Sequence, residues 1–288
     1  MPVFLLNRCI LKSDKGISIM KYILFCTGAL ILSVLLGVLA ELLVRRKRPW
    51  KRIWRFLTAS AMSLTALCLI TGGYFSVYYH ADEAARAAME SNETVRVTKE
   101  NGAWFFDGPG TENAVIFYPG AKVESEAYSG LLSRIAAGGT DCYLLDVPYH
   151  LAVLDADGAA RIIDTGSHAH WYTAGHSLGG VTAALFDIRH PEITEGVILF
   201  AAYPTKPLGH EERLLSVCGS EDLILDREEY EKGKKYWPAD AQECVIEGGN
   251  HSGFGSYGLQ AGDGEASVPN DVQQEACAQA VIRFIERK

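Results

Sequence analysis

The chain has 288 residues and a formal net charge of −8, which is divided unevenly along it. Residues 1–80 contain 11 Lys and Arg against two acidic residues, a net charge of +9, whereas residues 81–288 carry −17. The negative charge of the longer part would repel phosphates, which excludes nucleic acid as its main partner. The hydrophobic content of 48% excludes general disorder, and the seven cysteines lack the spacing of a disulfide scaffold or zinc site.

Residues 1–80 are expected to form a membrane anchor. Two apolar stretches, residues 22–44 and 56–79, each exceed the roughly 20 residues that a helix needs to cross a bilayer. A cleaved signal peptide is the alternative for the first stretch, but its apolar run is longer than usual and stops at four positive residues. Aromatic residues fall near the expected membrane interfaces: Trp50, Trp54, Tyr74, Tyr78 and Tyr79.

The positive charges predict the orientation of this anchor. Seven of them lie among residues 45–55, and short positive loops stay in the cytoplasm. Both termini and the acidic domain are therefore expected to be extracytoplasmic. Met20 is an alternative start, which would leave Lys21 as the only positive residue before the first span. On the more oxidising side, buried free thiols are expected over a disulfide for the cysteines of the acidic domain: Cys142, Cys218, Cys244 and Cys277.

The acidic part alternates strand-like and helical patterns. Residues 81–93 are expected to be a helix or linker, and residues 94–288 one domain. Asn101-Gly102, between strand-like runs, predicts a hairpin of residues 94–99 and 103–107. Further strands are expected at 114–118, 142–147, 171–174, 196–201, 214–218 and 244–247, and helices at 125–137, 178–189, 226–235 and 271–286. This alternation predicts an α/β fold with a mostly parallel sheet, helices on both faces and no room for a large cap.

In such a sheet, ligands bind beyond the carboxyl ends of the strands. There, residues 175–180 read Gly-His-Ser-Leu-Gly-Gly, between an expected strand and an expected helix. A serine within Gly-x-Ser-x-Gly in this context predicts a nucleophile elbow, which holds Ser177 above the sheet. The alternative is a glycine-rich turn with an idle serine. The neighbouring His176 is expected to point away and to serve in packing.

A serine nucleophile needs a base and an acid that orients the base. For this type of elbow, the acid and then the histidine follow the serine in the sequence. Asp222 lies just after the expected strand 214–218, and His251 lies just after 244–247. Glu221 stays open as the alternative acid, and an ordinary loop histidine is the alternative reading of His251.

An oxyanion hole requires two N–H donors. The amide of Leu178, directly after the serine, is the first candidate. The second is expected from the loop after residues 114–118, where Gly120 permits a close approach, with Ala121 preferred and Lys122 as the alternative. His150, after another strand end, is a candidate pocket residue. We expect no metal and no cofactor, because neither metal-ligand spacing nor a glycine-rich phosphate loop is found.

Three segments together resemble the α/β-hydrolase superfamily: residues 118–123, 175–180 and 248–251. The chain more closely resembles a bacterial family related to dienelactone hydrolases. That family carries a Gly-Asn-His-x-x-Phe-Gly-x-Tyr-Gly-x-Gln-x-Gly-Asp-Gly block, which stands here at residues 249–264. The resemblance covers about residues 94–287, and it implies the α/β-hydrolase fold and the same triad of Ser177, Asp222 and His251.

These features predict a membrane-anchored serine hydrolase that cleaves an ester-type bond through an acyl-enzyme on Ser177. A small-molecule or lipid-like acyl substrate is expected beside the membrane that residues 22–79 would cross. A peptidase, thioesterase or lipase with the same triad stays open. A non-catalytic binding module and a membrane scaffold are the alternatives from other classes, and no protein partner is indicated. The glycine-rich loop after His251 would either orient that histidine or form a wall of the acyl pocket.

Overall fold

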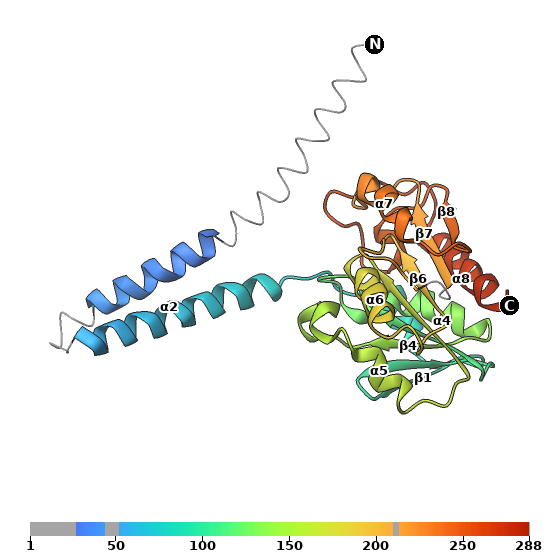
Figure 1. The fold of residues 1–288 in the computed structure, drawn as a ribbon, viewed down its shortest axis with the longest axis horizontal. Coiled ribbons are helices and arrows are strands. Elements are labelled where there is room, and N and C mark those ends of the chain that lie inside the picture. The colour runs from blue at the N-terminus through green and yellow to red at the C-terminus, as the bar shows by residue number, and fades with distance from the viewer. Residues whose placement is uncertain (1–26, 44–51, 210–212, 288) are drawn as a thin grey trace, which may run out of the picture. The chain divides into compact units, whose positions relative to one another are not determined.

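The computed structural model describes residues 27–43, 52–209 and 213–287, and the chain divides into two compact units, residues 1–77 and 78–288 (Figure 1). The second unit begins three residues before the domain boundary expected from the sequence. We describe each unit by itself.

The first unit contains the helix Thr27–Leu43 and α2 (Arg52–Phe75). Among the described helices, only α2 is both long and apolar enough to cross a membrane, whereas Thr27–Leu43 is a shorter apolar helix. Both ends of the first expected span, residues 22–44, lie outside the described residues. Within the unit, Arg55 Nε donates to Glu41 Oε1 at 2.6 Å, so the single acid of the first apolar stretch is paired.

α2 ends at Phe75, although the sequence predicted a span that continues to Tyr79. Its last turn contains Gly72 and Gly73, and glycine favours a helix less than any residue except proline. Tyr79 belongs to the second unit and forms a parallel β-bridge with Val123 there. The helix therefore ends four residues before the carboxyl end of the expected span, which stays a prediction.

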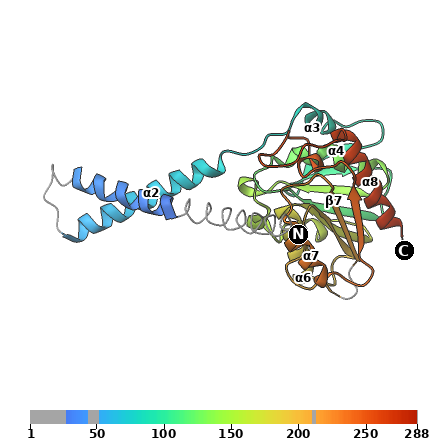
Figure 2. The same ribbon diagram turned by 90° about the horizontal axis from the view of Figure 1, so that it is seen from above.

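The second unit is built on an eight-stranded sheet in the order β1-β2-β4-β3-β5-β6-β7-β8 (Figures 1 and 2). The first two strands form the expected hairpin, β2 is antiparallel to β4, and all other neighbours are parallel. This confirms the mostly parallel sheet. The strands are β1 (Arg96–Glu100), β2 (Ala103–Asp107), β3 (Asn113–Tyr118), β4 (Asp141–Leu145), β5 (His170–His176), β6 (Gly196–Phe200), β7 (Arg213–Gly219) and β8 (Gln242–Ile246).

Helices cover both faces of the sheet. The helices of this unit are α3 (Glu83–Ala88), α4 (Ser129–Ala137), α5 (Gly158–Ile163), α6 (Leu178–Arg189), α7 (Arg227–Gly233) and α8 (Asn270–Glu286). The sequence did not indicate α5, because its six residues are too few to show a helical period. The described residues of the β6–β7 connection, 201–209, contain neither helix nor strand.

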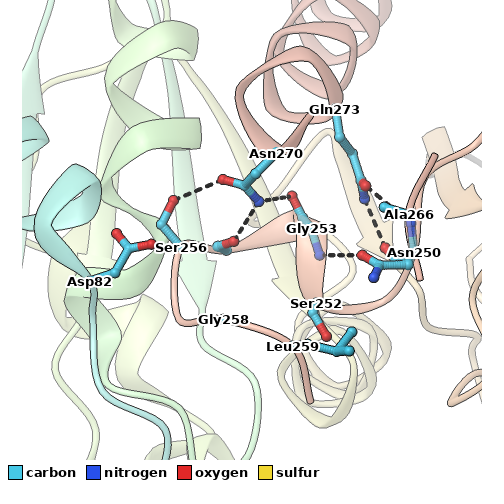
Figure 3. A pocket seen from close by; sticks show the side chains of 11 residues that line it. Asp82, Asn250, Ser252, Gly253, Ser256, Gly258, Leu259, Ala266, Asn270 and Gln273 are labelled. Carbon is cyan, nitrogen blue, oxygen red and sulfur yellow. Dashed lines mark hydrogen bonds between the residues drawn. The ribbon is translucent and has the colours of Figure 1, made fainter. Parts of the chain in front are cut away.

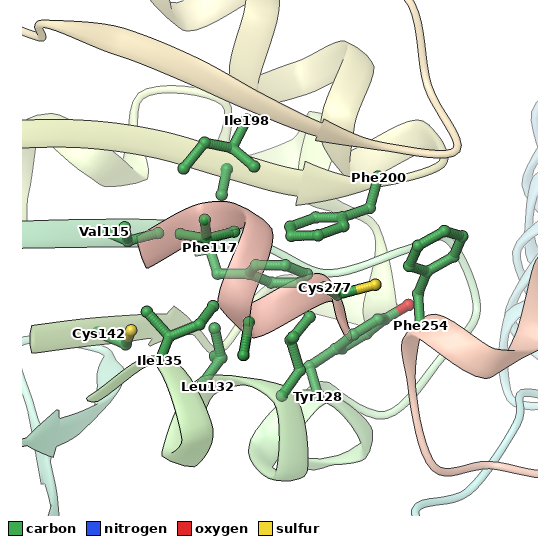
Figure 4. Close-up of a cluster of buried hydrophobic side chains, with 14 of the residues drawn as sticks. Val115, Phe117, Tyr128, Leu132, Ile135, Cys142, Ile198, Phe200, Phe254 and Cys277 are labelled. Atoms are coloured by element: carbon green, nitrogen blue, oxygen red, sulfur yellow. The ribbon is translucent and has the colours of Figure 1, made fainter. Parts of the chain in front are cut away.

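The core consists of two large hydrophobic clusters, one on each face, and β3 contributes to both. Its alternate residues Val115 and Phe117 pack with α4 and α8, whereas Ala114 and Ile116 pack with α5 and α6. Figure 4 shows the first of these clusters, with Phe117 surrounded by side chains from several elements. As expected, the cysteines of this unit are free thiols; Cys142, Cys218 and Cys277 are buried and Cys244 is half-buried. The core supports β3, β5, β7 and β8, and the candidate site lies at their carboxyl ends.

Candidate active site

Ser177 stands at the turn between β5 and α6, as the elbow motif predicts. Its backbone has φ +54° and ψ −122°, a conformation that costs a non-glycine residue about 1–3 kcal/mol. Two hydrogen bonds hold the turn: the Ser177 N–H donates to the carbonyl of Phe200 at 2.9 Å, and the Val181 N–H donates to the carbonyl of Ser177 at 3.1 Å. The side chain of Ser177 is thereby held, half-buried, at the carboxyl edge of the sheet.

The glycines of the motif are required by close backbone contacts. A Cβ atom on Gly175 would lie 2.4 Å from the carbonyl carbon of Gly179. A Cβ on Gly179 would lie 2.2 Å from the carbonyl oxygen of Tyr118, the last residue of β3. The first turn of α6 therefore packs directly against the end of β3 and against the loop that follows it.

Asp222 and His251 come together through a buried hydrogen bond. His251 Nδ1 lies 2.9 Å from Asp222 Oδ2, and the two residues are 1% and 2% exposed. The other carboxylate oxygen, Oδ1, accepts the N–H groups of Ile224 at 2.9 Å and Leu225 at 2.7 Å. Glu221 is exposed. The geometry thus pairs His251 with Asp222 rather than with Glu221.

The hydrogen bond to Asp222 leaves Nε2 of a neutral His251 as the proton acceptor. This nitrogen is buried and has no hydrogen-bond partner in the part of the chain that the structure describes, Ser177 included. Such bonds are often long in a site without substrate. His251 nevertheless lies beside the elbow, because its ring centroid is 4.4 Å from that of His176, the residue before Ser177.

The hydrogen bonds of the backbone amides near the elbow distinguish Ala121 from Lys122, the two candidate oxyanion donors in the loop after β3. The amides of Gly120, Lys122 and Val123 all donate hydrogen bonds within the unit. The amide of Ala121 has no hydrogen-bond partner among the described residues, and the same holds for Leu178 at the start of α6. The geometry therefore favours Ala121 over Lys122 as the second donor.

His176 takes part in a buried network that the sequence did not predict. The Tyr128 hydroxyl accepts the Gly120 N–H at 3.1 Å and lies 2.9 Å from His176 Nδ1. Burial, and next the neighbouring His251, lower the pKa of His176 well below its ordinary value, so its ring is neutral. The Tyr128 hydroxyl and His176 Nδ1 share this hydrogen bond, and the network joins the oxyanion loop to the ring that packs on His251.

Asp263, in the glycine-rich block, ties the two loops that carry Asp222 and His251. Its Oδ1 accepts the N–H groups of His251 at 3.3 Å and Leu223 at 3.4 Å. Its Oδ2 accepts the N–H and the hydroxyl of Ser252 at 2.8 and 2.6 Å. The only sequence signal for this role is its place in the Gly-Asp-Gly end of the block.

The same block surrounds a cavity of about 190 Å³ (Figure 3). Asn270 supports its wall, because its side-chain amide donates to the carbonyls of Gly253 at 3.1 Å and Gly255 at 2.9 Å. Neither Ser177 nor His251 lines this cavity. Of the two roles left open for the block, the hydrogen bonds of Asp263 favour orientation of the histidine.

Two other histidines differ in position. His150, the candidate pocket residue, packs its ring on Tyr78 at 3.8 Å between centroids, and burial lowers its pKa. His168 lies in the loop before β5, where its side chain is 8% exposed and bonds Asp141 at 2.8 Å. Asp141 begins β4, so this pair lies at the opposite edge from Ser177. No group of three potential metal-ligating side chains occurs within residues 27–43, 52–209 and 213–287.

Comparisons with known proteins agree with this architecture. The model of the alpha/beta hydrolase family matches residues 114–275. No curated protein matches the chain.

Similar solved structures include dienelactone hydrolase from Anabaena variabilis, with a TM-score of 0.52 and 15% identity over 67% of this chain and 98% of that one. A serine hydrolase involved in carbazole degradation has a TM-score of 0.50 and 12% identity, over 68% and 100% of the two chains. TT1662 from Thermus thermophilus has a TM-score of 0.50 and 16% identity, over 67% and 99%. Identities this low show a shared fold.

Proposed function

The chain belongs to the alpha/beta hydrolase family, and we propose that it is a serine hydrolase that cleaves an ester-type bond through an acyl-enzyme on Ser177. The observation that carries the proposal is the buried hydrogen bond of 2.9 Å between His251 and Asp222, beside the strained elbow. This pair supplies the base and the orienting acid that a serine hydroxyl needs as a nucleophile.

In this mechanism Ser177 attacks the substrate carbonyl while His251 Nε2 takes the hydroxyl proton. Asp222 holds the imidazole in the required tautomer and stabilises the imidazolium. The amides of Leu178 and Ala121 stabilise the negative charge on the tetrahedral oxygen. His251 then gives its proton to the leaving alcohol. In the second stage His251 takes a proton from water, which attacks the acyl-enzyme, and then returns that proton to Ser177 as the acid is released.

We also propose that the first unit anchors the enzyme in a membrane and that the hydrolase unit faces away from the cytoplasm. The support is the length and apolar character of α2, whose apolar window has no buried residue, and the seven positive charges among residues 45–55. Protease added to intact cells should then remove the hydrolase unit. Full protection of that unit, with cleavage after lysis, would contradict this orientation.

The proposed substrate is a small-molecule or lipid-like acyl ester. A peptidase, thioesterase or lipase would use the same triad. Substrates that share one acyl group and differ in their leaving group therefore distinguish the bond that is cleaved. We expect purified full-length protein to cleave an ester faster than the thioester or anilide of the same acid. Esters of graded chain length then define the preferred acyl group.

A fluorophosphonate probe tests the reaction class. The full-length protein should be labelled at Ser177, and Ser177→Ala should lose both labelling and ester turnover. Ser76→Ala, an exposed serine of the other unit, is the matched control and should retain both. If folded wild-type protein is not labelled and hydrolyses no ester, a non-catalytic binding module becomes the favoured function.

A further inference from the structure

The first residues of the second unit contact the loops of the candidate active site. Tyr79 pairs with the loop after β3: its N–H donates to the carbonyl of Lys122 at 2.8 Å, and its carbonyl accepts the Glu124 N–H at 2.9 Å. A further bond fastens the same segment, since the Ala81 N–H donates to Glu124 Oε2 at 2.7 Å. Residues 79–81 thus run along the loop that contains Ala121.

The same segment also holds the glycine-rich block. The Tyr79 hydroxyl accepts the N–H of Ala261 at 3.0 Å, and its ring lies 5.6 Å from the ring of Tyr257. Three residues later, the Asp82 N–H donates to the carbonyl of Ser256 at 2.9 Å. One short segment therefore contacts both the oxyanion loop and the loop that follows His251.

The oxyanion loop needs such support because Lys122 has a backbone φ of +58°. A left-handed backbone at a non-glycine residue persists only where its surroundings hold it. Here both sides of Lys122 are held: its N–H donates to the carbonyl of His150 at 2.8 Å, and its carbonyl accepts from Tyr79. The free amide of Ala121 directly precedes this fixed residue.

We propose that Tyr79 is a positioning residue of the oxyanion hole: its backbone pairing with residues Lys122 and Glu124 holds the loop that aims the amide of Ala121 at the substrate. The proposal rests on the serine hydrolase function. Activity would then require the segment directly after α2 in its paired position, independently of any membrane.

Proline substitution tests the backbone contact in the full-length protein. Tyr79→Pro removes the N–H that donates to Lys122, whereas Val77→Pro removes an N–H without a partner among the described residues, at an exposed site. Loss of one oxyanion donor lowers kcat by roughly 10²–10³-fold, and we expect a decrease of about 10- to 100-fold for Tyr79→Pro. KM should change less than about threefold, because the contact acts in the transition state.

A trifluoromethyl ketone distinguishes positioning from general loosening. Its adduct with Ser177 places an alkoxide in the oxyanion hole, so its affinity should fall in parallel with kcat in Tyr79→Pro and stay unchanged in Val77→Pro. Tyr79→Phe keeps the backbone pairing and loses only the hydroxyl that accepts the Ala261 N–H, so its kcat and inhibitor affinity should stay well above those of Tyr79→Pro. Folded Tyr79→Pro with the kcat and inhibitor affinity of Val77→Pro would overturn the proposal.

Glu124 provides a second route should Tyr79→Pro not fold. Glu124→Ala removes the acceptor of the Ala81 N–H and should lower kcat, whereas Glu124→Gln keeps an amide oxygen there and should restore it. Equal kcat in these two variants would overturn the proposal. If wild-type protein itself shows neither probe labelling nor esterase activity, the proposed function fails, and this proposal fails with it.

Discussion

The rings of His176 and His251 pack on each other at 4.4 Å between centroids, inclined by 52°. The residue before the candidate nucleophile therefore shapes the environment of the candidate base. His176 is 1% exposed and has no resolved hydrogen-bond partner at Nε2 within the described chain. Its other nitrogen faces Tyr128, so the two histidines and this tyrosine form one buried unit around the elbow.

Tyr128→Phe should lower turnover without removing any member of the triad. The change leaves the Gly120 N–H and His176 Nδ1 unpaired in a buried place, which costs about 1–3 kcal/mol. We expect kcat to fall about 10-fold. Tyr143→Phe is the control, because the Tyr143 hydroxyl has no hydrogen bond to the described residues. Steady-state kinetics with one ester compare the two variants, and equal rates would contradict this role.

Asp222→Asn should be far more harmful than Glu221→Gln. The amide cannot hold the His251 tautomer whose Nε2 accepts the serine proton, and such a change lowers kcat by roughly 10⁴-fold in a serine triad. Glu221 is exposed, and its substitution should leave kcat within about twofold. Burst and steady-state kinetics on the same ester measure both. A larger loss in Glu221→Gln would reverse the assignment of the acid.

Asp263→Asn should weaken the link between the loops of Asp222 and His251. An amide offers one acceptor oxygen, so it leaves either the His251 side or the Ser252 side of the contact without its acceptor. We expect kcat/KM to fall about 10- to 100-fold, equivalent to roughly 1.4–2.7 kcal/mol. Glu265→Gln removes the same charge from an exposed position in this loop and should be neutral. Comparable kcat/KM values for the two variants would rule out the link.

The stability of the hydrolase unit should decrease in mild acid because of His176. Burial holds the pKa of this residue well below its ordinary value of 6.5, so the unfolded chain binds a proton that the folded chain does not. The unfolding free energy should therefore fall as pH drops below about 6.5, by up to ~1.4 kcal/mol per pH unit from this group. Thermal unfolding of His176→Asn should show a shallower dependence between about pH 5 and 7. Parallel curves for the two proteins would show that another group dominates.

The sequence predicted the positions of Ser177 and His251 because each follows an apolar run that forms a strand, the buried β5 and the partly buried edge strand β8. Such strands are read as short apolar runs, and the glycines that follow mark where the backbone leaves the sheet. The orientation of Asp222 toward His251, and the exposure of the neighbouring Glu221, were not predictable in this way. The orientation depends on the local bonds of Asp222 with two later amides, which a list of residue types does not reveal.

The supporting residues were less accessible to sequence analysis. His176 meets Tyr128 and His251 only through the tertiary fold. Asp263 meets Leu223 only through the tertiary fold. Tyr79 ends an apolar run, and hydropathy does not separate an aromatic ring at a membrane interface from one that packs on protein.

The glycine-rich block begins and ends at nearly the same point of the fold. The Ser267 N–H donates to the carbonyl of Gly248 at 2.8 Å, and the Asn250 side chain donates to the carbonyl of Gly264 at 2.7 Å. The segment is therefore a loop whose two ends lie close together, and it is also bonded to neighbouring residues such as Leu223 and Asn270. Its exchange for the corresponding segment of a relative needs only two backbone junctions, near Gly248 and Asn270, and leaves the strands untouched.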